Sequence, residues 1–313
     1  MAPVSAVICR ALVKRYDGGV VAVDGLDLEV RAGECFGLLG PNGAGKTTTV
    51  EILEGYHDRN AGDVEVLGVD PAAADRGWRQ RIGFVLQECR LTPELTVWEA
   101  IEQYAGYYDS PREVGGTIEL VGLTEKANTR TARLSGGQQR RLDVALALIG
   151  DPELLFLDEP TTGFDPSARR QAWDVIRSLR DLGKTVFLTT HYMEEAQELA
   201  DRAAIIAEGR IIAEGDPDQL GGRGSAQAMI RFRLPEGARV ASLPAPFTEA
   251  AGSGRGEISL ASADPVRDLR ALLDWSAGNG GELPGLEVSR PSLEDVYLEL
   301  TGREPEGERG EGA

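Results

Sequence analysis

A glycine-rich stretch near the N-terminus has the residue types needed to hold a phosphate chain. Residues 40–47 read GPNGAGKT and lie between a run that predicts a strand (residues 34–39) and a run that predicts a helix. Glycines let successive backbone N–H groups point inward at phosphate oxygens, and the N-terminus of the following helix adds positive potential. Lys46 would place its ammonium at the β and γ phosphates, and Thr47 would offer its hydroxyl to Mg²⁺. The predicted nucleotide-binding residues are Gly40, Pro41, Asn42, Gly43, Ala44, Gly45, Lys46, Thr47 and Thr48.

Two adjacent carboxylates follow a second apolar run. The segment LLFLDEP at residues 154–160 predicts a buried strand with Asp158 and Glu159 at its end. Neighbouring residues on a strand point to opposite faces, so the two carboxylates should have different roles. We expect Asp158 to hold Mg²⁺ through water, and Glu159 to orient or deprotonate the attacking water. The other interpretation, an acidic turn before Pro160, is disfavoured because the phosphate-binding pattern is present in the same chain.

A histidine adds to these groups. His191 is one of two histidines in the chain and follows the strand-like run TVFLTT. Sites in α/β proteins gather at the carboxyl ends of strands, so a contact between His191 and the γ-phosphate is favoured over a surface role. We therefore place His191 beside Glu159 among the catalytic residues.

The elements that must position these residues alternate along the first two thirds of the chain. From residue 6 to about 220, short apolar runs alternate with helical patterns, which predicts a nucleotide-binding α/β domain at residues 1–220. The clearest strands are predicted at residues 34–39, 154–157, 185–189 and 203–207. From residue 91 helical spacing replaces the strand signal, which predicts an inserted helical subdomain at about residues 91–140.

A change of composition marks a second domain. Three glycines at positions 221, 222 and 224 break the pattern, and residues 221–302 predict a small α+β accessory domain. Its expected elements are strands at 228–234, 257–261 and 286–289 and helices at 266–276 and 292–300. The charged, glycine-rich tail at residues 303–313 is expected to be disordered.

Charge and cysteine content exclude several classes of protein. The chain has 51 acidic and 33 basic residues and a formal net charge of −18, so no nucleic-acid partner is expected. Cys9, Cys35 and Cys89 are too far apart for a metal or redox motif and are expected to be reduced thiols, as in a cytosolic protein. The chain has neither a signal-peptide pattern nor an apolar run of roughly 18 residues, so membrane work would belong to a partner chain.

The segment LSGGQQRR at residues 134–141, ahead of the LLFLDEP strand, is the deciding family feature. Taken alone it is a helix start capped by serine. With the glycine-rich loop before it and the LLFLDEP strand after it, this segment makes residues 6 to about 220 resemble the ATP-binding domain of ABC transporters. The resemblance implies an α/β P-loop NTPase fold, with a RecA-like core, an antiparallel β subdomain and a helical subdomain. It also implies that a second copy of the chain contacts ATP through its signature residues, namely Leu134, Ser135, Gly136, Gly137 and Gln138.

The same resemblance assigns roles to three further residues. Tyr16 looks like the aromatic residue that stacks on adenine, and Asp165 looks like the D-loop aspartate. Gln87 looks like the Q-loop residue that contacts Mg²⁺ and the catalytic water. Phe164 stands where leucine is commoner, a mild departure. The implied activity is ATP hydrolysis with Mg²⁺, in a homodimer that encloses two ATP molecules and opens after the γ-phosphate is lost.

The C-terminal segment RPSLEDVYLELTGRE at residues 290–304 resembles the subgroup that serves ABC-2 type permeases, which includes daunorubicin-type resistance ATPases. This resemblance implies export of a drug, antibiotic or lipid-like substrate by a chain bound through its permease at the cytoplasmic face of the membrane. The segment is also readable as an amphipathic helix capped by Ser292. Trp98, Tyr104, Tyr107 and Tyr108 are candidate permease contacts, although aromatics at helical spacing are more often core.

Two other functions stay open. One is a non-transport ABC ATPase that acts on ribosomes or DNA, against which stand the single ATPase cassette and the negative charge. The other is an importer ATPase, against which only the C-terminal resemblance argues.

Overall fold

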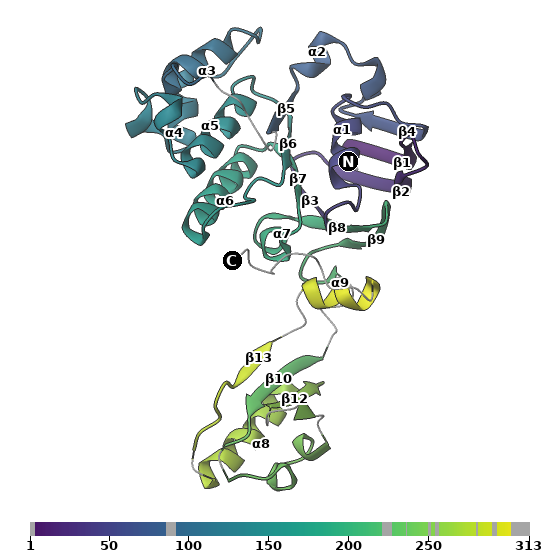
Figure 1. Cartoon of the computed structure of the whole chain (residues 1–313), viewed down its shortest axis with the longest axis vertical. Coiled ribbons are helices and arrows are strands. Elements are labelled where there is room, and N and C mark those ends of the chain that lie inside the picture. The colour runs from purple at the N-terminus through teal and green to yellow at the C-terminus, as the bar shows by residue number, and fades with distance from the viewer. Residues whose placement is uncertain are drawn as a thin grey trace. The chain divides into compact units, whose positions relative to one another are not determined.

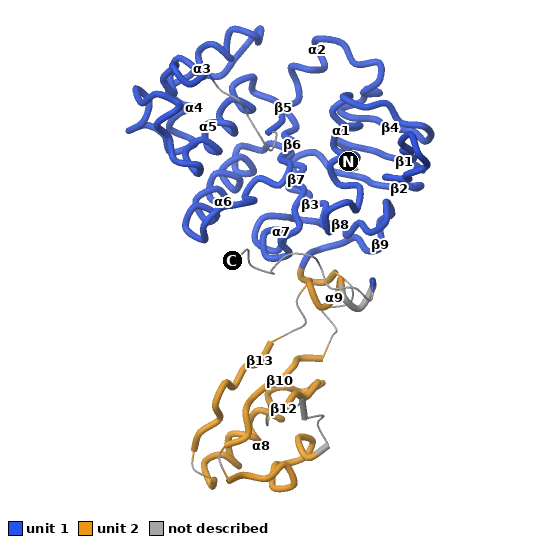
Figure 2. The backbone as a smooth tube through the Cα atoms, in the orientation of Figure 1, with its two compact units in different colours: residues 1–217, 300–313 blue, residues 218–299 orange. Residues whose placement is uncertain are grey.

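The computed structural model describes residues 4–85, 92–220, 227–235, 237–249, 252–253, 257–279, 281–289 and 293–301. The chain forms two compact units, one of residues 1–217 with 300–313 and one of residues 218–299 (Figure 2). Each unit is described by itself.

A six-stranded sheet forms the centre of the first unit, with strand order β5-β6-β7-β3-β8-β9. The first five strands in this order are parallel, and β9 is antiparallel to β8. Every residue of β3, β6 and β7 is buried, as expected for strands covered on both faces. Strands β3, β6, β7 and β8 confirm the four clearest strand predictions. The bounds are β3 Cys35–Leu39, β5 Ile82–Val85, β6 Leu154–Asp158, β7 Thr185–Thr190, β8 Arg202–Ala207 and β9 Arg210–Gly215.

A three-stranded antiparallel sheet lies on one side of this centre (Figure 1). It has the order β2-β1-β4, from β1 (Ser5–Arg15), β2 (Val21–Arg31) and β4 (Ala61–Val66). Its buried face packs with helix α1 (Lys46–Leu53) and the central sheet in one hydrophobic cluster. A short helix α2 (Arg76–Arg79) leads from there to β5.

Helices gather on the other side of the central sheet, where α3 to α6 lie together in Figure 1. They are α3 Val97–Ala105, α4 Val114–Leu120, α5 Gly136–Leu148 and α6 Pro166–Asp181. Helices α3, α4 and the start of α5 fall within the helical insert predicted at about residues 91–140, and α5 continues beyond that bound. The reason is the buried run LDVALAL, whose apolar residues all belong to the cluster shared with β6 and α6. Helix α7 (Met193–Leu199) follows β7.

The second unit is built from an antiparallel sheet with the order β11-β12-β10-β13. Its core contains Ile230, Phe232, Leu243, Phe247 and Ile258, together with Leu272 of helix α8. This is the predicted small α+β unit, with one addition, the two-residue strand β11. Its elements are β10 Ala228–Arg233, β11 Gly252–Ser253, β12 Glu257–Ser262, α8 Pro265–Gly278, β13 Glu287–Ser289 and most of α9 Leu293–Thr301, whose last two residues belong to the first unit. The predicted cap Ser292 and the tail lie outside the described residues.

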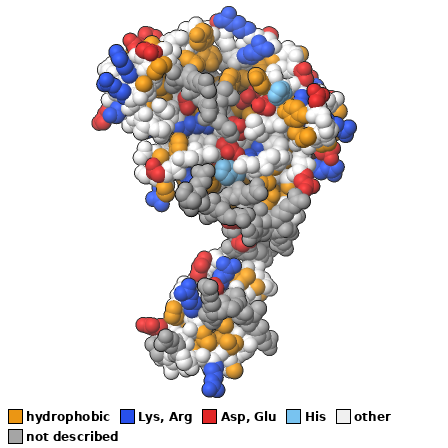
Figure 3. All heavy atoms as spheres, viewed as in Figure 1, with side chains coloured by type: hydrophobic (Ala, Val, Ile, Leu, Met, Phe, Trp, Pro, Cys, Tyr) orange, Lys and Arg blue, Asp and Glu red, His pale blue; other side chains and the backbone are white. Residues whose placement is uncertain are grey.

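The surface mixes both signs of charge. On the face in Figure 3, acidic and basic side chains are interspersed over both units. Within the described residues, no helix combines the length and apolar character needed to cross a membrane.

Candidate active site

The glycine-rich loop at residues 40–47, called the phosphate loop below, joins β3 to α1 and is packed too closely for side chains at two positions. A Cβ on Gly40 would lie 2.4 Å from the carbonyl oxygen of Ile206, and a Cβ on Gly45 would lie 2.3 Å from that of Ala22. Gly45 also has a φ of 106°, which side chains rarely adopt. Helix α1 begins directly after it, at Lys46. The glycines thus allow the tight turn that a helix N-terminus needs to bind phosphate.

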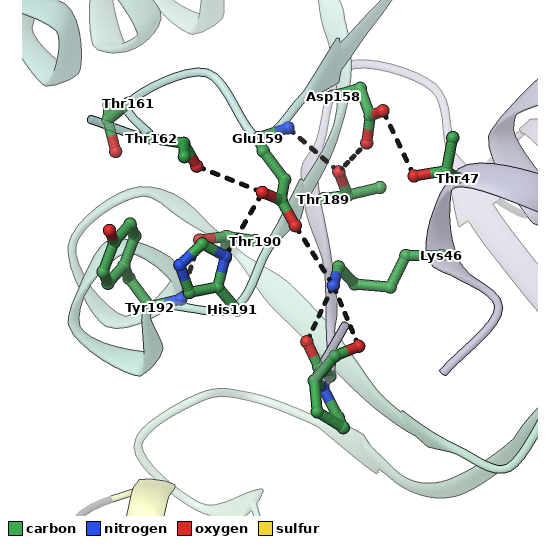
Figure 4. A network of polar contacts seen from close by, with 12 residues as sticks. Lys46, Thr47, Asp158, Glu159, Thr161, Thr162, Thr189, Thr190, His191 and Tyr192 are labelled. Carbon is green, nitrogen blue, oxygen red and sulfur yellow. Dashed lines mark hydrogen bonds and ion pairs between the residues drawn. The ribbon is translucent and has the colours of Figure 1, made fainter. Parts of the chain in front are cut away.

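Lys46 is almost fully buried, with 4% of its surface exposed, and its ammonium bridges the loop to a carboxylate. It donates hydrogen bonds to the carbonyl oxygens of Gly40 (2.8 Å) and Pro41 (3.2 Å). Its third close contact is Glu159 Oε1, at 3.2 Å. The cation therefore lies between the loop and the end of β6, where a phosphate group could exchange for the carboxylate (Figure 4).

Asp158 and Thr47 form an oxygen pair suited to Mg²⁺. Thr47 Oγ1 lies 3.3 Å from one carboxylate oxygen of Asp158, and the Thr189 hydroxyl donates to the other. Magnesium prefers oxygen ligands and is usually held by one or two carboxylates together with waters and substrate phosphates. The described residues contain no group of three or more His, Cys, Asp or Glu that could hold a metal. One carboxylate with one hydroxyl fits a nucleotide-bound magnesium ion, and both residues are the predicted ones.

Glu159 occupies the centre of the site, between the cation of Lys46 and the ring of His191 (Figure 4). Its Oε2 lies 3.3 Å from His191 Nδ1 and accepts a hydrogen bond from the Thr162 hydroxyl at 3.1 Å. The contact with His191 and the charge of Lys46 lower the pKa of Glu159 to about 2, so its carboxylate is ionised at neutral pH.

The backbone explains why two neighbouring carboxylates face different partners. Strand β6 ends at Asp158, and Glu159 has a φ of 45°, in the left-handed region. Its N–H donates both to the carbonyl oxygen (3.1 Å) and to the hydroxyl (3.0 Å) of Thr189. This turn directs Asp158 to Thr47 and Glu159 to Lys46 and His191. The two carboxylates thus face different partners because the strand ends between them, and not through the strand alternation on which the prediction rested.

The signature segment begins α5. Ser135 is exposed and is the N-cap of the helix, in a capping box with Gln138. Leu134 is buried at 7% exposure, whereas Gly136 is exposed. A Cβ on Gly137 would lie 3.3 Å from Ala168 of α6, so this glycine allows the two helix starts to approach. The serine hydroxyl and the first N–H groups of α5 thus form an accessible helix N-terminus, which favours anions.

Of three further predicted site residues, the structure describes two, Tyr16 and Asp165. Tyr16 is 37% exposed, and its hydroxyl lies 3.4 Å from Thr48 Oγ1, next to the phosphate loop. Asp165 caps α6 by accepting hydrogen bonds from the N–H groups of residues 167 (2.8 Å) and 168 (2.9 Å). Gln87 lies outside the described residues.

Arg140 is a site residue that the sequence prediction missed. It is buried, at 8% exposure, and its guanidinium donates to the carbonyl oxygens of Asp158 (3.0 Å) and Pro160 (3.1 Å). Arg140, which belongs to α5, therefore connects this helix to the turn on which both carboxylates lie. The one available signal was the paired arginine at the end of LSGGQQRR.

Comparisons with known proteins agree with this geometry. A family model described as ABC transporter matches residues 23–162, and one described as ABC transporter domain-containing protein-like, C-terminal domain, matches residues 228–292. The Nod factor export ATP-binding protein I of Burkholderia pseudomallei (strain 1710b) is 43% identical over 297 residues, covering 93% of this chain and 95% of that protein. The protein of the same name from Rhizobium sp. (strain N33) is 42% identical, covering 94% and 96%.

Solved structures share the fold of the first unit. The cbiO1 protein of Clostridium perfringens, part of the ABC transporter complex cbiONQ, has a TM-score of 0.64 and 26% identity, covering 69% of this chain and 90% of that one. A dimeric ATP-binding cassette in a post-hydrolysis state with ADP and phosphate has a TM-score of 0.60 and 26% identity, covering 67% and 98%. These matches confirm the predicted P-loop NTPase fold. With relatives above 40% identity along nearly the whole chain, the protein belongs to the ABC transporter ATP-binding proteins and is an ATPase of that family.

Proposed function

We propose that two copies of this chain enclose two ATP molecules and use their hydrolysis to drive export through a separate ABC-2 type permease. The cargo would be a drug, an antibiotic or a lipid-like molecule, and the ATPase would sit at the cytoplasmic face of the membrane through its permease. Support comes from the relatives, whose name is Nod factor export ATP-binding protein I, and from the cassette structure that is dimeric.

The observation that best supports these residue roles is the position of Glu159 between Lys46 and His191. The Glu159 carboxylate lies 3.2 Å from Lys46 Nζ and 3.3 Å from His191 Nδ1. Lys46 would bind the β and γ phosphates, and His191 would contact the γ-phosphate. Asp158, Thr47 and Gln87 would hold Mg²⁺, which supplies charge neutralisation at the phosphates.

Glu159 would then act in two states. In the arrangement described above, His191 and Lys46 stabilise its carboxylate and lower its pKa to about 2, which makes it a weak base. When the γ-phosphate takes over Lys46, the carboxylate loses a cation that lowered its pKa, and its basicity rises. It is then free to orient a water molecule and accept its proton. Binding of ATP thus prepares the base.

The second copy would complete the site. Ser135 and the glycines that follow it are an accessible helix start, and we propose that they contact the γ-phosphate held by the other copy's Lys46. Tyr16 would stack on adenine, and Asp165 would lie at the contact of the two copies. Closure then depends on an anion shared by both copies, and its loss permits opening.

The base assignment is tested with Glu159→Gln. The variant keeps the shape of the side chain but cannot accept the proton, so we expect ATP binding within about two-fold of the parent and a turnover at least about 100-fold lower. Glu153→Gln, at an exposed carboxylate that pairs with Arg81, is the control and keeps parental turnover. Hydrolysis by Glu159→Gln at the parental rate would show that another group is the base.

Trapped ATP also tests the dimer. Glu159→Gln with MgATP should elute at twice the monomer mass of 33.6 kDa in light-scattering chromatography, and with ADP at the monomer mass. Export is tested by co-producing the chain with a candidate ABC-2 type permease and following efflux of a lipid-like dye from cells. Efflux that persists with Glu159→Gln would contradict the coupling.

A further inference from the structure

Glu195 is a fully buried carboxylate that the site described above does not use. It lies on α7, four residues after His191, and none of its surface is exposed. Burial raises its pKa, and the hydrogen bonds that it receives act in the opposite direction. Glutamate is rarely buried completely unless its oxygens have specific partners, so its contacts should reveal its role.

The donors to this carboxylate come from different segments. The Thr161 hydroxyl donates to Glu195 Oε1 at 2.8 Å, and the Trp173 indole N–H donates to the same oxygen at 3.1 Å. The Thr190 hydroxyl also lies close enough to the carboxylate to lower the pKa of Glu195, and Glu195 Oε2 has no hydrogen-bond partner among the described residues. Thr161 belongs to the turn after β6, Trp173 to α6 and Thr190 to the end of β7. One carboxylate therefore ties three segments together.

The first of these segments carries the proposed base. Thr161 is two residues after Glu159, and the next residue, Thr162, donates to Glu159 Oε2 at 3.1 Å. Glu159 itself holds a left-handed backbone conformation, with a φ of 45°. Such a conformation persists only where the surroundings fix it. The bond from Thr161 to Glu195 fixes one end of this turn.

The second segment carries the histidine. Thr190 directly precedes His191, whose Nδ1 lies 3.3 Å from the same Glu159 oxygen. Figure 4 shows both segments, with Thr161 next to Thr162 on one and Thr190 next to His191 on the other. The residues that meet Glu159 Oε2 are thus each adjacent in sequence to a residue that contacts Glu195.

We propose that Glu195 is a positioning residue for ATP hydrolysis, which holds the turn after β6 against the end of β7 so that Glu159 and His191 meet at the reacting water. It touches neither nucleotide nor water, and acts by accepting hydrogen bonds from Thr161 and Trp173. The inference rests on the proposed roles of Glu159 and His191. A displacement of about 1 Å at such a pair can lower the chemical rate about 100-fold while leaving binding intact.

The test compares Glu195→Ala, Glu195→Gln and the control Glu194→Ala, whose side chain is exposed on the same helix. We expect Glu195→Ala to bind ATP within about three-fold of the parent and to lose about 100-fold in kcat. Glutamine keeps an oxygen that accepts from Thr161 and Trp173, so Glu195→Gln should recover kcat to within about five-fold of the parent. Glu194→Ala should match the parent.

A purely structural role predicts a different result, in which Glu195→Ala has a lower melting temperature but parental kcat, and this would overturn the proposal. Failure of glutamine to rescue would overturn it as well. If Glu195→Ala does not fold, Thr161→Val decides, because it removes one donor at nearly constant volume. We expect about a ten-fold loss of kcat with unchanged ATP affinity, and parental kcat would refute the proposal. An active Glu159→Gln would instead refute the site assignment itself.

Discussion

At the residue scale, Glu54 is a further carboxylate with an unusual pKa near the site. It is the C-cap residue of α1, the helix that starts at the phosphate loop. Burial, followed by the negative charges of Asp158 and Glu51, raises the pKa of Glu54 to about 8. The folded chain therefore holds a proton there at a pH at which an unfolded chain, with an ordinary glutamate, has lost it.

This proton makes stability depend on pH. The folded pKa exceeds the ordinary value of 4.5, so its contribution to folding stability is complete below about pH 4.5 and is lost as the pH rises through about 8. Glu54→Gln removes the titration, and its melting temperature should fall less than the parent's between about pH 6 and pH 9, without nucleotide or Mg²⁺. Glu65→Gln, at an exposed position on β4, is the control. Parallel melting curves for Glu54→Gln and the parent would contradict the expectation.

Sequence patterns predicted those site residues whose role can be recognised from their neighbours in the sequence. Lys46 is recognisable from its glycines, and Asp158 from the apolar run before it. The roles of Thr189 and Arg140 cannot be inferred from their near neighbours, because their contacts with Asp158 cross 31 and 18 residues of sequence. The left-handed backbone conformation of Glu159 could not be predicted from sequence either, because it depends on hydrogen bonds to β7.

At the scale of elements, two helices begin in the same way but lie in different settings. Helix α3 starts with a capping box in which Thr96 Oγ1 accepts from the Glu99 N–H at 3.2 Å and the Glu99 carboxylate accepts from the Thr96 N–H at 2.8 Å. Helix α5 starts with the equivalent pair Ser135 and Gln138, at 3.4 Å and 3.0 Å. Both motifs are visible in the sequence, as T-x-x-E and S-x-x-Q.

Alanine variants of the two N-cap residues, Thr96 and Ser135, distinguish a capping role from a catalytic one. Thr96→Ala and Ser135→Ala should each lower the free energy of unfolding by about 1 kcal/mol, measured by urea titration, because each removes one N-cap. Only Ser135→Ala should also lower ATP turnover, by about ten-fold or more, because it removes a proposed hydrogen bond to the γ-phosphate. Equal turnover in the two variants would mean that Ser135 only caps α5.

At the scale of the whole molecule, the chain has separate cores. Among the described residues, the first unit has two clusters that share the central sheet, and the second has a cluster of its own. The glycines near residue 221 suggested a boundary, and the compact units divide between residues 217 and 218. Sequence patterns gave the order of elements in the second unit, but not strand β11, because two residues carry no periodicity.

Because the cores are separate, a substitution in one core should destabilise its own unit and leave the other unit unchanged. Phe232 is 1% exposed and packs edge-to-face on Phe247, with ring centroids 5.7 Å apart, in the core of the second unit. Phe232→Ala should cost about 3 to 5 kcal/mol in that unit and lower its transition in differential scanning calorimetry. ATP affinity should stay within about two-fold of the parent, since every proposed ATP contact lies in the first unit. Phe187→Ala, in the core beneath the site, is the counterpart and should abolish binding. A ten-fold loss of affinity in Phe232→Ala would mean that the folding of the two units is coupled.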